Sequence, residues 1–292
     1  MRRSLLFLPS NNPNMLQNGG QLDADGLIFD LEDAVSPDEK DAARELLKNA
    51  LASLKFGRCT LTVRINGLDT PYWEEDLEAI LPLRPDSIMP PKVSGAPYIQ
   101  KLDEKLTALE RAYGIPEGHT KLIALLETAV GVENAYAIAT ASPRVEALFL
   151  GAEDLTADLR CQRTKEGAEI AYARGRVVMA ARAAGVEAYD TPFTDVRDIE
   201  GLEQDAAYAK SLGFSGKACI SPAHVAGVNR AFSPSAQEIQ YAKDVFGAIE
   251  EAKRQGKGAI SLRGKMIDAP IVQRARLVLE AAQEIEGVDV DA

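Results

Sequence analysis

The stretch Leu148–Leu155, which reads LFLGAEDL, decides how the rest of the chain is interpreted. The apolar run Val145–Leu150 predicts a buried strand, and this run stops at Gly151, directly before the acids Glu153 and Asp154. In a parallel α/β barrel the loops that follow the strands converge on one face, and catalytic residues lie there. The pattern therefore predicts a strand whose carboxyl end carries functional acids.

A second stretch ends in the same way, because the apolar run 122–126 is followed at once by Glu127 and Thr128. Two strand-terminal carboxylates, Glu127 and Asp154, suit a hard divalent cation such as Mg²⁺, with water and substrate oxygens as the remaining ligands. A simpler interpretation is that both acids merely favour the positive ends of the helices that follow. These two stretches alone leave both interpretations open.

Most of the chain repeats this alternation of short apolar runs and helical segments. Runs that are apolar throughout indicate a parallel sheet whose two faces are both covered. The connection after the first run is short for a helix, so the count depends on the whole pattern. We expect an α/β fold, a (β/α)8 TIM barrel. The eight runs are 5–8, 26–29, 60–66, 87–89, 122–126, 145–150, 186–191 and 216–220.

Local signals predict where some of the helices begin. Ser36 and Glu39 have the spacing of a capping box, with a proline between them, and open a helix that continues to about Leu54. A long helix is expected over residues 166–184, because Gly185 follows it as a stop signal.

The end of the chain has more helix than a barrel needs. Ser235 and Glu238 form a second capping box, which opens a further helix. We therefore expect two parts, a catalytic barrel domain over residues 1–232 and a C-terminal helical extension over residues 233–292. The extension is long enough to serve as a lid or as an oligomerisation arm.

Bulk properties narrow the class of protein. The 292 residues carry a formal net charge of −11, which argues against nucleic acid as the main partner. Cys59, Cys161 and Cys219 are scattered, which favours a reducing cytosol over a disulfide framework or a structural zinc site. No run approaches the roughly 18 apolar residues of a membrane span. We expect a soluble, cytoplasmic protein that binds neither membrane nor nucleic acid.

The chemical inventory is narrow. The sequence contains two histidines, and His119 lies between Gly118 and Thr120, where a surface loop is expected. It contains no G-x-S-x-G elbow and no glycine-rich phosphate loop. What remains is the strand-end acids together with Arg64, which also closes a strand. Its guanidinium can bind a substrate carboxylate, hold a developing oxyanion or form a salt bridge to one of the acids, and these roles can coexist.

Seven stretches, taken in chain order, resemble one family. Together they look like the citrate lyase β-subunit (CitE-like) branch of the acyl-CoA lyases, within the HpcH/HpaI aldolase–citrate lyase superfamily. The resemblance covers nearly the whole chain, and residues 163–169 look more like citrate lyase β than like the malyl-CoA lyases. The seven stretches are 3–9, 29–33, 63–66, 127–128, 151–155, 213–217 and 264–268.

The resemblance implies specific roles for four residues. Glu127 and Asp154 would be the Mg²⁺ ligands, with Glu127 also facing the substrate, and Arg64 would contact the substrate beside the metal. Asp268 would be a catalytic lid acid that reaches into the site of a neighbouring subunit. The alternative for Asp268 is an ordinary helix N-cap, since it stands just before a turn that contains Pro270.

The acids near residue 30 complete the implied site. Asp30 and Asp33 would be catalytic and Glu32 substrate-binding, all three at the rim, where they would position metal-bound waters. The related pyruvate aldolases show a D-x-E-H pattern, whereas this chain has Asp33 in place of the histidine. The aldolase base is therefore missing, and we rank an aldolase well below a lyase.

The leading hypothesis is a Mg²⁺-dependent lyase that cleaves a citryl thioester, on an acyl-carrier protein or CoA, to an acetyl thioester and oxaloacetate. A stand-alone citramalyl-, malyl- or methylmalyl-CoA lyase is the alternative enzyme, and a non-catalytic scaffold subunit is the alternative from another class. The resemblance also implies a homo-oligomer, a trimer or hexamer, and association with citrate lyase α and γ subunits.

Overall fold

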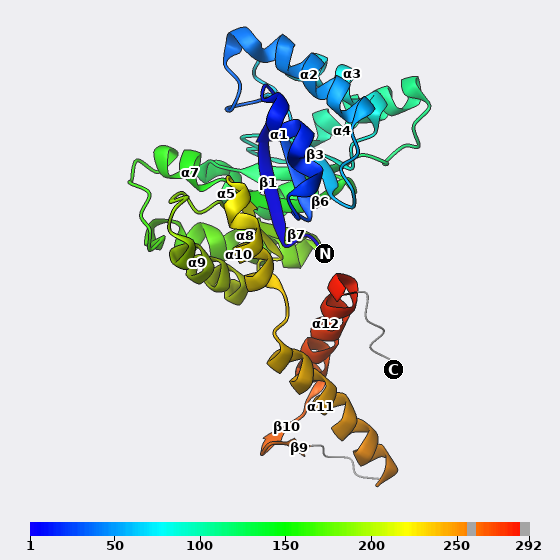
Figure 1. Cartoon of the computed structure of the whole chain (residues 1–292), viewed down its shortest axis with the longest axis vertical. Helices are drawn as coiled ribbons and strands as arrows, with labels where there is room; N and C mark the ends of the chain where they lie inside the picture. The colour runs from blue at the N-terminus through cyan, green and yellow to red at the C-terminus, as the bar shows by residue number, and fades with distance from the viewer. Residues whose placement is uncertain (256–260, 287–292) are drawn as a thin grey trace. The chain divides into compact units, whose positions relative to one another are not determined.

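The computed structural model describes residues 1–255 and 261–286, and its first part is a closed barrel of eight parallel strands (Figure 1). Each strand pairs with the next along the chain, and the first pairs with the last to close the barrel. The predicted TIM barrel is therefore confirmed. The strands are β1 (Ser4–Pro9), β2 (Gly26–Asp30), β3 (Thr60–Arg64), β4 (Ser87–Met89), β5 (Lys121–Leu126), β6 (Val145–Leu150), β7 (Glu187–Asp190) and β8 (Gly216–Cys219).

Helices connect the strands, including the short first connection, where the Oδ1 atom of Asn12 caps a six-residue helix by accepting from the N–H of Met15. The barrel helices are α1 (Pro13–Asn18), α2 (Lys40–Ser53), α3 (Trp73–Ile80), α4 (Ala96–Tyr113), α5 (Ala129–Glu133), α6 (Ala135–Ala139), α7 (Ala152–Asp158), α8 (Ala171–Ala184), α9 (Ile199–Leu212) and α10 (Pro222–Phe232). Single 3-10 turns lie at Gly19–Gln21, Pro37–Glu39, Leu81–Leu83 and Ala168–Ile170.

The predicted capping box at Ser36 is wrong. Ser36 makes no side-chain capping hydrogen bond, residues 37–39 form a 3-10 turn, and α2 begins at Lys40. The carboxylate of Glu39 accepts instead from the amide of Asn11, at 2.7 Å, so it is not available to the backbone of Ser36. A tertiary contact thus replaces the local one.

The predicted start of the long helix at about residue 166 is also too early, because α8 begins at Ala171. Gly167 adopts a left-handed conformation, with φ of 68°, which interrupts a helix at this point. The carboxylate of Glu169 accepts from the backbone N–H and the hydroxyl of Thr164, at 3.0 and 2.6 Å. These bonds organise the segment as a loop.

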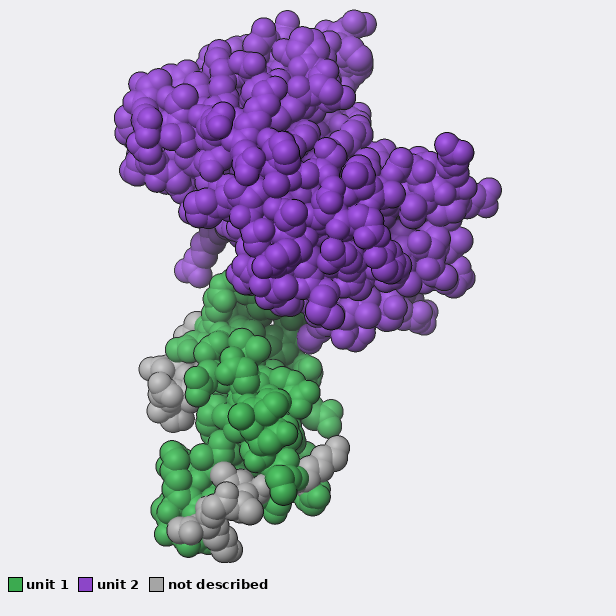
Figure 2. All heavy atoms as spheres, turned by 180° about the vertical axis from the view of Figure 1, so that it is seen from behind, with its two compact units in different colours: residues 1, 230–292 green, residues 2–229 purple. Residues whose placement is uncertain are grey.

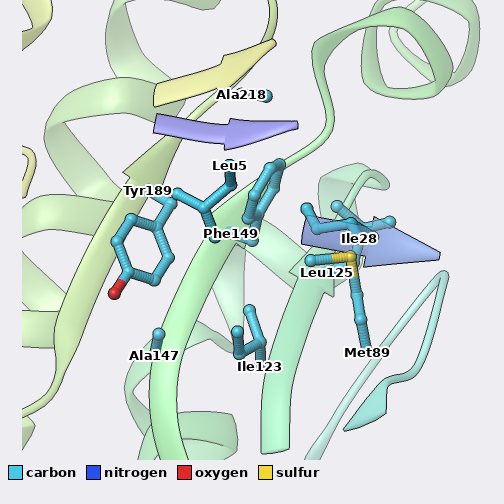
Figure 3. Close-up of a cluster of buried hydrophobic side chains, with 9 residues drawn as sticks. All are labelled: Leu5, Ile28, Met89, Ile123, Leu125, Ala147, Phe149, Tyr189 and Ala218. Carbon is cyan, nitrogen blue, oxygen red and sulfur yellow. The ribbon is translucent and has the colours of Figure 1, made fainter. Parts of the chain in front are cut away.

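The inside of the barrel is filled by side chains from alternate strand positions (Figure 3). Leu5 and Phe7 point inward from β1, and Ala147 and Phe149 do so from β6. The intervening residues are buried on the outer face beneath the helices, as at Leu6. Both faces of each strand are therefore covered, which explains the unbroken apolar runs in the sequence. The remaining members of the inner cluster are Ile28, Met89, Ile123, Leu125, Tyr189 and Ala218.

The chain divides into two compact units, residues 2–229 and residues 230–292 with Met1 (Figure 2). The second unit contains α11 (Ala236–Arg254), a small antiparallel pair β9 (Ser261–Leu262) and β10 (Lys265–Met266), and α12 (Ala269–Glu286). The capping box at Ser235 and Glu238 is present, as predicted. The predicted roles, a catalytic domain over 1–232 and a lid or oligomerisation extension over 233–292, stay predictions. No helix in the described ranges is long and apolar enough to cross a membrane.

Candidate active site

A cavity of about 490 Å³ opens at the carboxyl ends of the barrel strands. Phe7, Leu125 and Phe149 from the inner cluster form part of its apolar lining, and the rings of Phe7 and Phe149 meet edge to face with centroids 6.0 Å apart. The charged residues that line it are Asp30, Asp33, Arg64, Glu127, Glu153 and Asp154. The structure thus brings together five of the predicted site residues, because each follows or ends a barrel strand.

Asp30 and Arg64 are the last residues of the neighbouring strands β2 and β3, and the parallel register places them side by side. The Nε atom of Arg64 donates to Oδ1 of Asp30 at 2.8 Å, and Nη2 donates to Oδ2 at 2.5 Å. Asp30 also accepts from the N–H groups of Glu32 and Ala34, at 2.8 and 3.1 Å. With four donors around a buried carboxylate, Asp30 holds Arg64 in one orientation.

The guanidinium of Arg64 lies among acids on its other side as well. Its Nη1 atom is 3.0 Å from a carboxylate oxygen of Glu32 and 3.6 Å from one of Asp33. Burial alone would lower the pKa of Arg64, but Asp30, Glu32 and Asp33 raise it above its usual value, so the group stays charged. The salt-bridge interpretation of Arg64 is therefore confirmed, and the side chain still lines the cavity.

Glu127 follows β5 and is 2% exposed. Its Oε1 atom accepts from the backbone N–H of Lys92 at 2.8 Å. A Cβ atom at position 151 would lie 2.8 Å from both Cβ and Oε2 of Glu127. The close approach of the segment after β6 to Glu127 therefore requires glycine at this position. Burial raises the pKa of Glu127 to about 8, and the carboxylates of Glu32 and Asp154 act in the same direction.

Glu127 does not cap the helix that follows it. Thr128 is the N-cap of α5, since its hydroxyl accepts from the N–H of Gly131 at 3.2 Å. The carboxylate of Asp158, from α7, accepts from the N–H of Ala129 at 2.7 Å. Two other side chains thus make the capping hydrogen bonds of α5, and Glu127 makes none of them.

Asp154 lies in the first turn of α7 and lines the cavity, with its side chain 42% exposed. Gly151 precedes the helix as an N-cap without a side chain, and the hydroxyl of Thr191 accepts from the N–H of Ala152 at 3.1 Å instead. Asp154 still benefits from the helix dipole at this position. Its side chain remains available to the cavity.

A buried ion network holds Thr191 in place behind this wall of the cavity. The ammonium of Lys217 donates to the carbonyl of Thr191 at 2.7 Å and to Asp190 at 2.6 Å. Arg174 binds the same Asp190 through two hydrogen bonds, of 3.0 and 2.9 Å, and all four side chains are fully buried. The network therefore supports α7 through Thr191.

Sequence reasoning missed Lys92, which stands three residues after the end of β4, directly after Pro90 and Pro91. Its ammonium lies 3.0 Å from Oε1 of Glu32 and 4.0 Å from Oδ2 of Asp154, while its N–H binds Glu127. The sequence did contain a signal for Lys92, because this residue, like the acids, is a charged residue in the loop that follows a barrel strand.

Asp268 belongs to the second unit, where it caps α12. Its Oδ1 atom accepts from the N–H of Ile271 at 3.1 Å, and the side chain is exposed. The capping interpretation is therefore confirmed, and a catalytic role in a neighbouring subunit stays a prediction. The glycines at 264 and within 256–258 also predict a hinge that would let the end of the chain close over the barrel of a neighbouring subunit. Gly264 has φ of 79°, and residues 256–258 lie outside the described residues.

The two histidines do not enter the cavity. His119 is exposed in the loop before β5, as predicted. His224 is fully buried in α10, where burial lowers its pKa below the usual value.

The donor set at the cavity fits Mg²⁺. Glu127 and Asp154 supply hard carboxylate oxygens from adjacent strand ends. The pKa of Glu127 is raised first by burial and then by the carboxylates of Glu32 and Asp154, whose negative charge a cation would offset. Within residues 1–255 and 261–286, no three or more His, Cys, Asp or Glu side chains are placed to hold a metal by themselves. This matches Mg²⁺, which keeps several waters and binds through one or two carboxylates plus substrate.

A TIM barrel whose strand ends carry paired carboxylates and an anchored arginine has the groups of a metal-assisted enzyme active site. Residues 3–222 match the family described as HpcH/HpaI aldolase/citrate lyase, and the chain belongs to this family. The resemblance found in the sequence is thereby confirmed.

Individual relatives span nearly the whole chain. A citrate lyase subunit beta from Leuconostoc mesenteroides subsp. cremoris is 44% identical, over 99% of this chain and 96% of the relative. An L-malyl-CoA/beta-methylmalyl-CoA lyase from Cereibacter sphaeroides is 35% identical, over 98% and 96%. Among solved structures, CitE from Mycobacterium tuberculosis in complex with magnesium, acetoacetate and coenzyme A is 31% identical, with a TM-score of 0.79 over 96% of this chain and 98% of that one.

Proposed function

We propose that this chain is a Mg²⁺-dependent carbon–carbon lyase of the citrate lyase β-subunit type, which cleaves a citryl thioester to an acetyl thioester and oxaloacetate. The observation that carries the proposal is the pairing of Glu127 and Asp154 beside a guanidinium that Asp30 locks in place. The 44% identity to a citrate lyase subunit beta supports this substrate class.

In this reaction the hydroxyl and the adjacent carboxylate of the substrate approach Glu127 and Asp154. Mg²⁺ held by these two carboxylates would lower the pKa of the substrate hydroxyl and bind the 2-oxo acid that forms. The apolar wall formed by the buried Leu125 and Phe149 and the partly buried Phe7 excludes water from the carbon that leaves as an enolate.

Arg64 supplies the positive charge for the enolate. A guanidinium has five N–H groups, and the contacts to Asp30 and Glu32 engage three of them. The two that remain can donate to substrate oxygens, and because Asp30 fixes the group, little reorganisation is needed in the transition state. Asp30 is thus a positioning residue. Asp33, with its side chain 56% exposed, is the carboxylate we assign to accept the proton that leaves the substrate hydroxyl as the carbon–carbon bond breaks, and to deliver that proton to the α-carbon of the enolate.

We propose that the thioester donor is CoA or an acyl-carrier protein. The coenzyme A bound to CitE of Mycobacterium tuberculosis supports a thioester at this kind of site. We further propose a cytoplasmic homo-oligomer, a trimer or hexamer, associated with citrate lyase α and γ subunits.

The second candidate is a stand-alone lyase for malyl- or methylmalyl-CoA, which the 35% identity to the Cereibacter sphaeroides enzyme favours. A panel of citryl-, citramalyl- and malyl-CoA with purified protein and Mg²⁺ separates the candidates. We expect citryl thioester to be cleaved and the Glu127→Gln variant to be inactive. Cleavage of malyl-CoA alone would establish the second candidate. If no CoA ester reacts, citryl-carrier protein is the deciding substrate.

A further inference from the structure

Lys92 contacts three acids of the candidate active site at once. Its ammonium is 3.0 Å from Oε1 of Glu32 and 4.0 Å from Oδ2 of Asp154, and its backbone N–H donates to Oε1 of Glu127 at 2.8 Å. The side chain and the main chain of one residue thus reach the whole acid group, which we define as Glu32, Glu127 and Asp154.

The backbone of Lys92 is held in a conformation that lysine rarely adopts. Its φ is 50°, in the left-handed region that Gly or Asn would favour. The residues on either side are pinned, because the hydroxyl of Tyr98 donates to the carbonyl of Pro91 at 2.9 Å and the N–H of Val93 donates to the carbonyl of Leu125 at 3.1 Å. The surrounding structure therefore imposes the position from which the ammonium reaches the acids.

The acid group needs positive charge when no metal is bound. Arg64 supplies part of it, but its strongest contacts are with Asp30, outside the group. The ammonium of Lys92 adds a second positive charge, from a side chain that is 46% exposed. Mg²⁺ bound by Glu127 and Asp154 would bring a second, larger positive charge to the same place, and the two cations would repel each other.

We propose that Lys92 is the resident counter-ion of the metal-free site, and that Mg²⁺ displaces its ammonium from Asp154 when it binds. This inference rests on the proposed function only in taking Mg²⁺ as the metal. After displacement the ammonium keeps Glu32, now 3.0 Å away, as its partner. Lys92 therefore makes the metal-free acid group tolerable at the cost of weaker metal binding.

The test is Mg²⁺ binding to the full chain, measured by calorimetry with the metal alone, without substrate, in alkaline low-salt buffer. Lys92→Asn removes the ammonium but keeps the N–H to Glu127, and asparagine tolerates the left-handed backbone. We expect Mg²⁺ to bind on the order of tenfold more tightly to Lys92→Asn than to the unaltered protein. Lys92→Arg, which retains the charge, should bind much as the unaltered protein does.

A matched control is Lys105→Met. Lys105 also bridges two carboxylates, those of Glu74 and Glu78, at 2.9 and 2.8 Å. Lys105 lies on the outer helix α4, however, and both glutamates lie on the outer helix α3. This control should leave Mg²⁺ affinity unchanged.

General damage to the site would weaken metal binding, so the expected change has the opposite sign from misfolding. Unchanged or weaker Mg²⁺ affinity in Lys92→Asn overturns the proposal. If Lys92→Asn fails to fold, the same comparison is made with Lys92→Gln. The second readout is the unfolding temperature, which Mg²⁺ should raise more in the neutral variant than in the unaltered protein. Failure of every thioester to react would refute the proposed function but leave this metal-binding comparison decisive.

Discussion

Replacing Asp30 by asparagine tests whether this carboxylate acts through Arg64. The substitution keeps the size and one oxygen, but its NH₂ group must face donors that Asp30 now satisfies, namely Nη2 of Arg64 and the N–H of Ala34. Breaking a buried ion pair typically costs about 3–5 kcal/mol. Because Arg64 keeps its contacts with Glu32 and Asp33, we expect the low end, about 3 kcal/mol in the free energy of unfolding.

Calorimetry measures the loss of stability in Asp30→Asn, and steady-state kinetics measures its loss of activity. For a barrel of this size each kcal/mol shifts Tm by about 2–4 °C, so Tm should fall by about 6–12 °C. Since an unanchored guanidinium loses its preorganisation, kcat should fall on the order of a hundredfold at saturating Mg²⁺. Arg64→Lys should lose a similar factor, because lysine cannot make the forked contact with Asp30.

The chain provides a matched control in Glu110, at the opposite end of the barrel. Glu110 is fully buried and accepts two bonds from Arg144, at 2.8 and 2.6 Å, and two from the N–H groups of Thr120 and Gly118. Glu110→Gln should lower Tm as much as Asp30→Asn but leave kcat near its original value. An equal loss of kcat in both variants, or full kcat in Asp30→Asn, would refute the positioning role.

Three further predictions concern the metal site and the second unit. Asp154→Asn and Glu127→Gln should each abolish Mg²⁺-dependent turnover with Tm unchanged or raised, and near-original rates in both would refute the ligand assignment. Mg²⁺ affinity should rise from about pH 6 to about pH 8, because Glu127, with its pKa raised to about 8, must lose its proton to bind the metal. Calorimetry in two buffers measures the affinity and the proton released. An affinity that does not change with pH contradicts the prediction. Asp268→Ala should lower the free energy of unfolding by about 1 kcal/mol, because the N-cap of α12 is lost. If Asp268 serves a neighbouring subunit, mixed oligomers of Asp268→Ala and Glu127→Gln protomers should regain activity. No recovery after confirmed mixing excludes that role.

The sequence predicted the barrel because the signal for it is local and repeated. Most barrel strands bury both of their faces and therefore read as apolar runs, and eight such runs with helices between them indicate one architecture. The same reasoning found Glu127, Asp154 and Arg64, since the end of a strand marks the catalytic face wherever the strand lies in the barrel. Ser235 and Glu238 form their predicted cap, because its two hydrogen bonds join residues only three positions apart in the chain.

Only the tertiary structure decided which of these groups interact. The capping pattern at Ser36 fails because Asn11, far away in the sequence, binds Glu39. The partnership of Asp30 with Arg64 depends on the register between β2 and β3. Lys92 follows a barrel strand as the acids do, but its approach to Glu32, Glu127 and Asp154 depends on the ends of β2, β4, β5 and β6 meeting at one face of the barrel. Strand pairing sets distances between residues that are remote in the chain, whereas sequence patterns report only the neighbours along it.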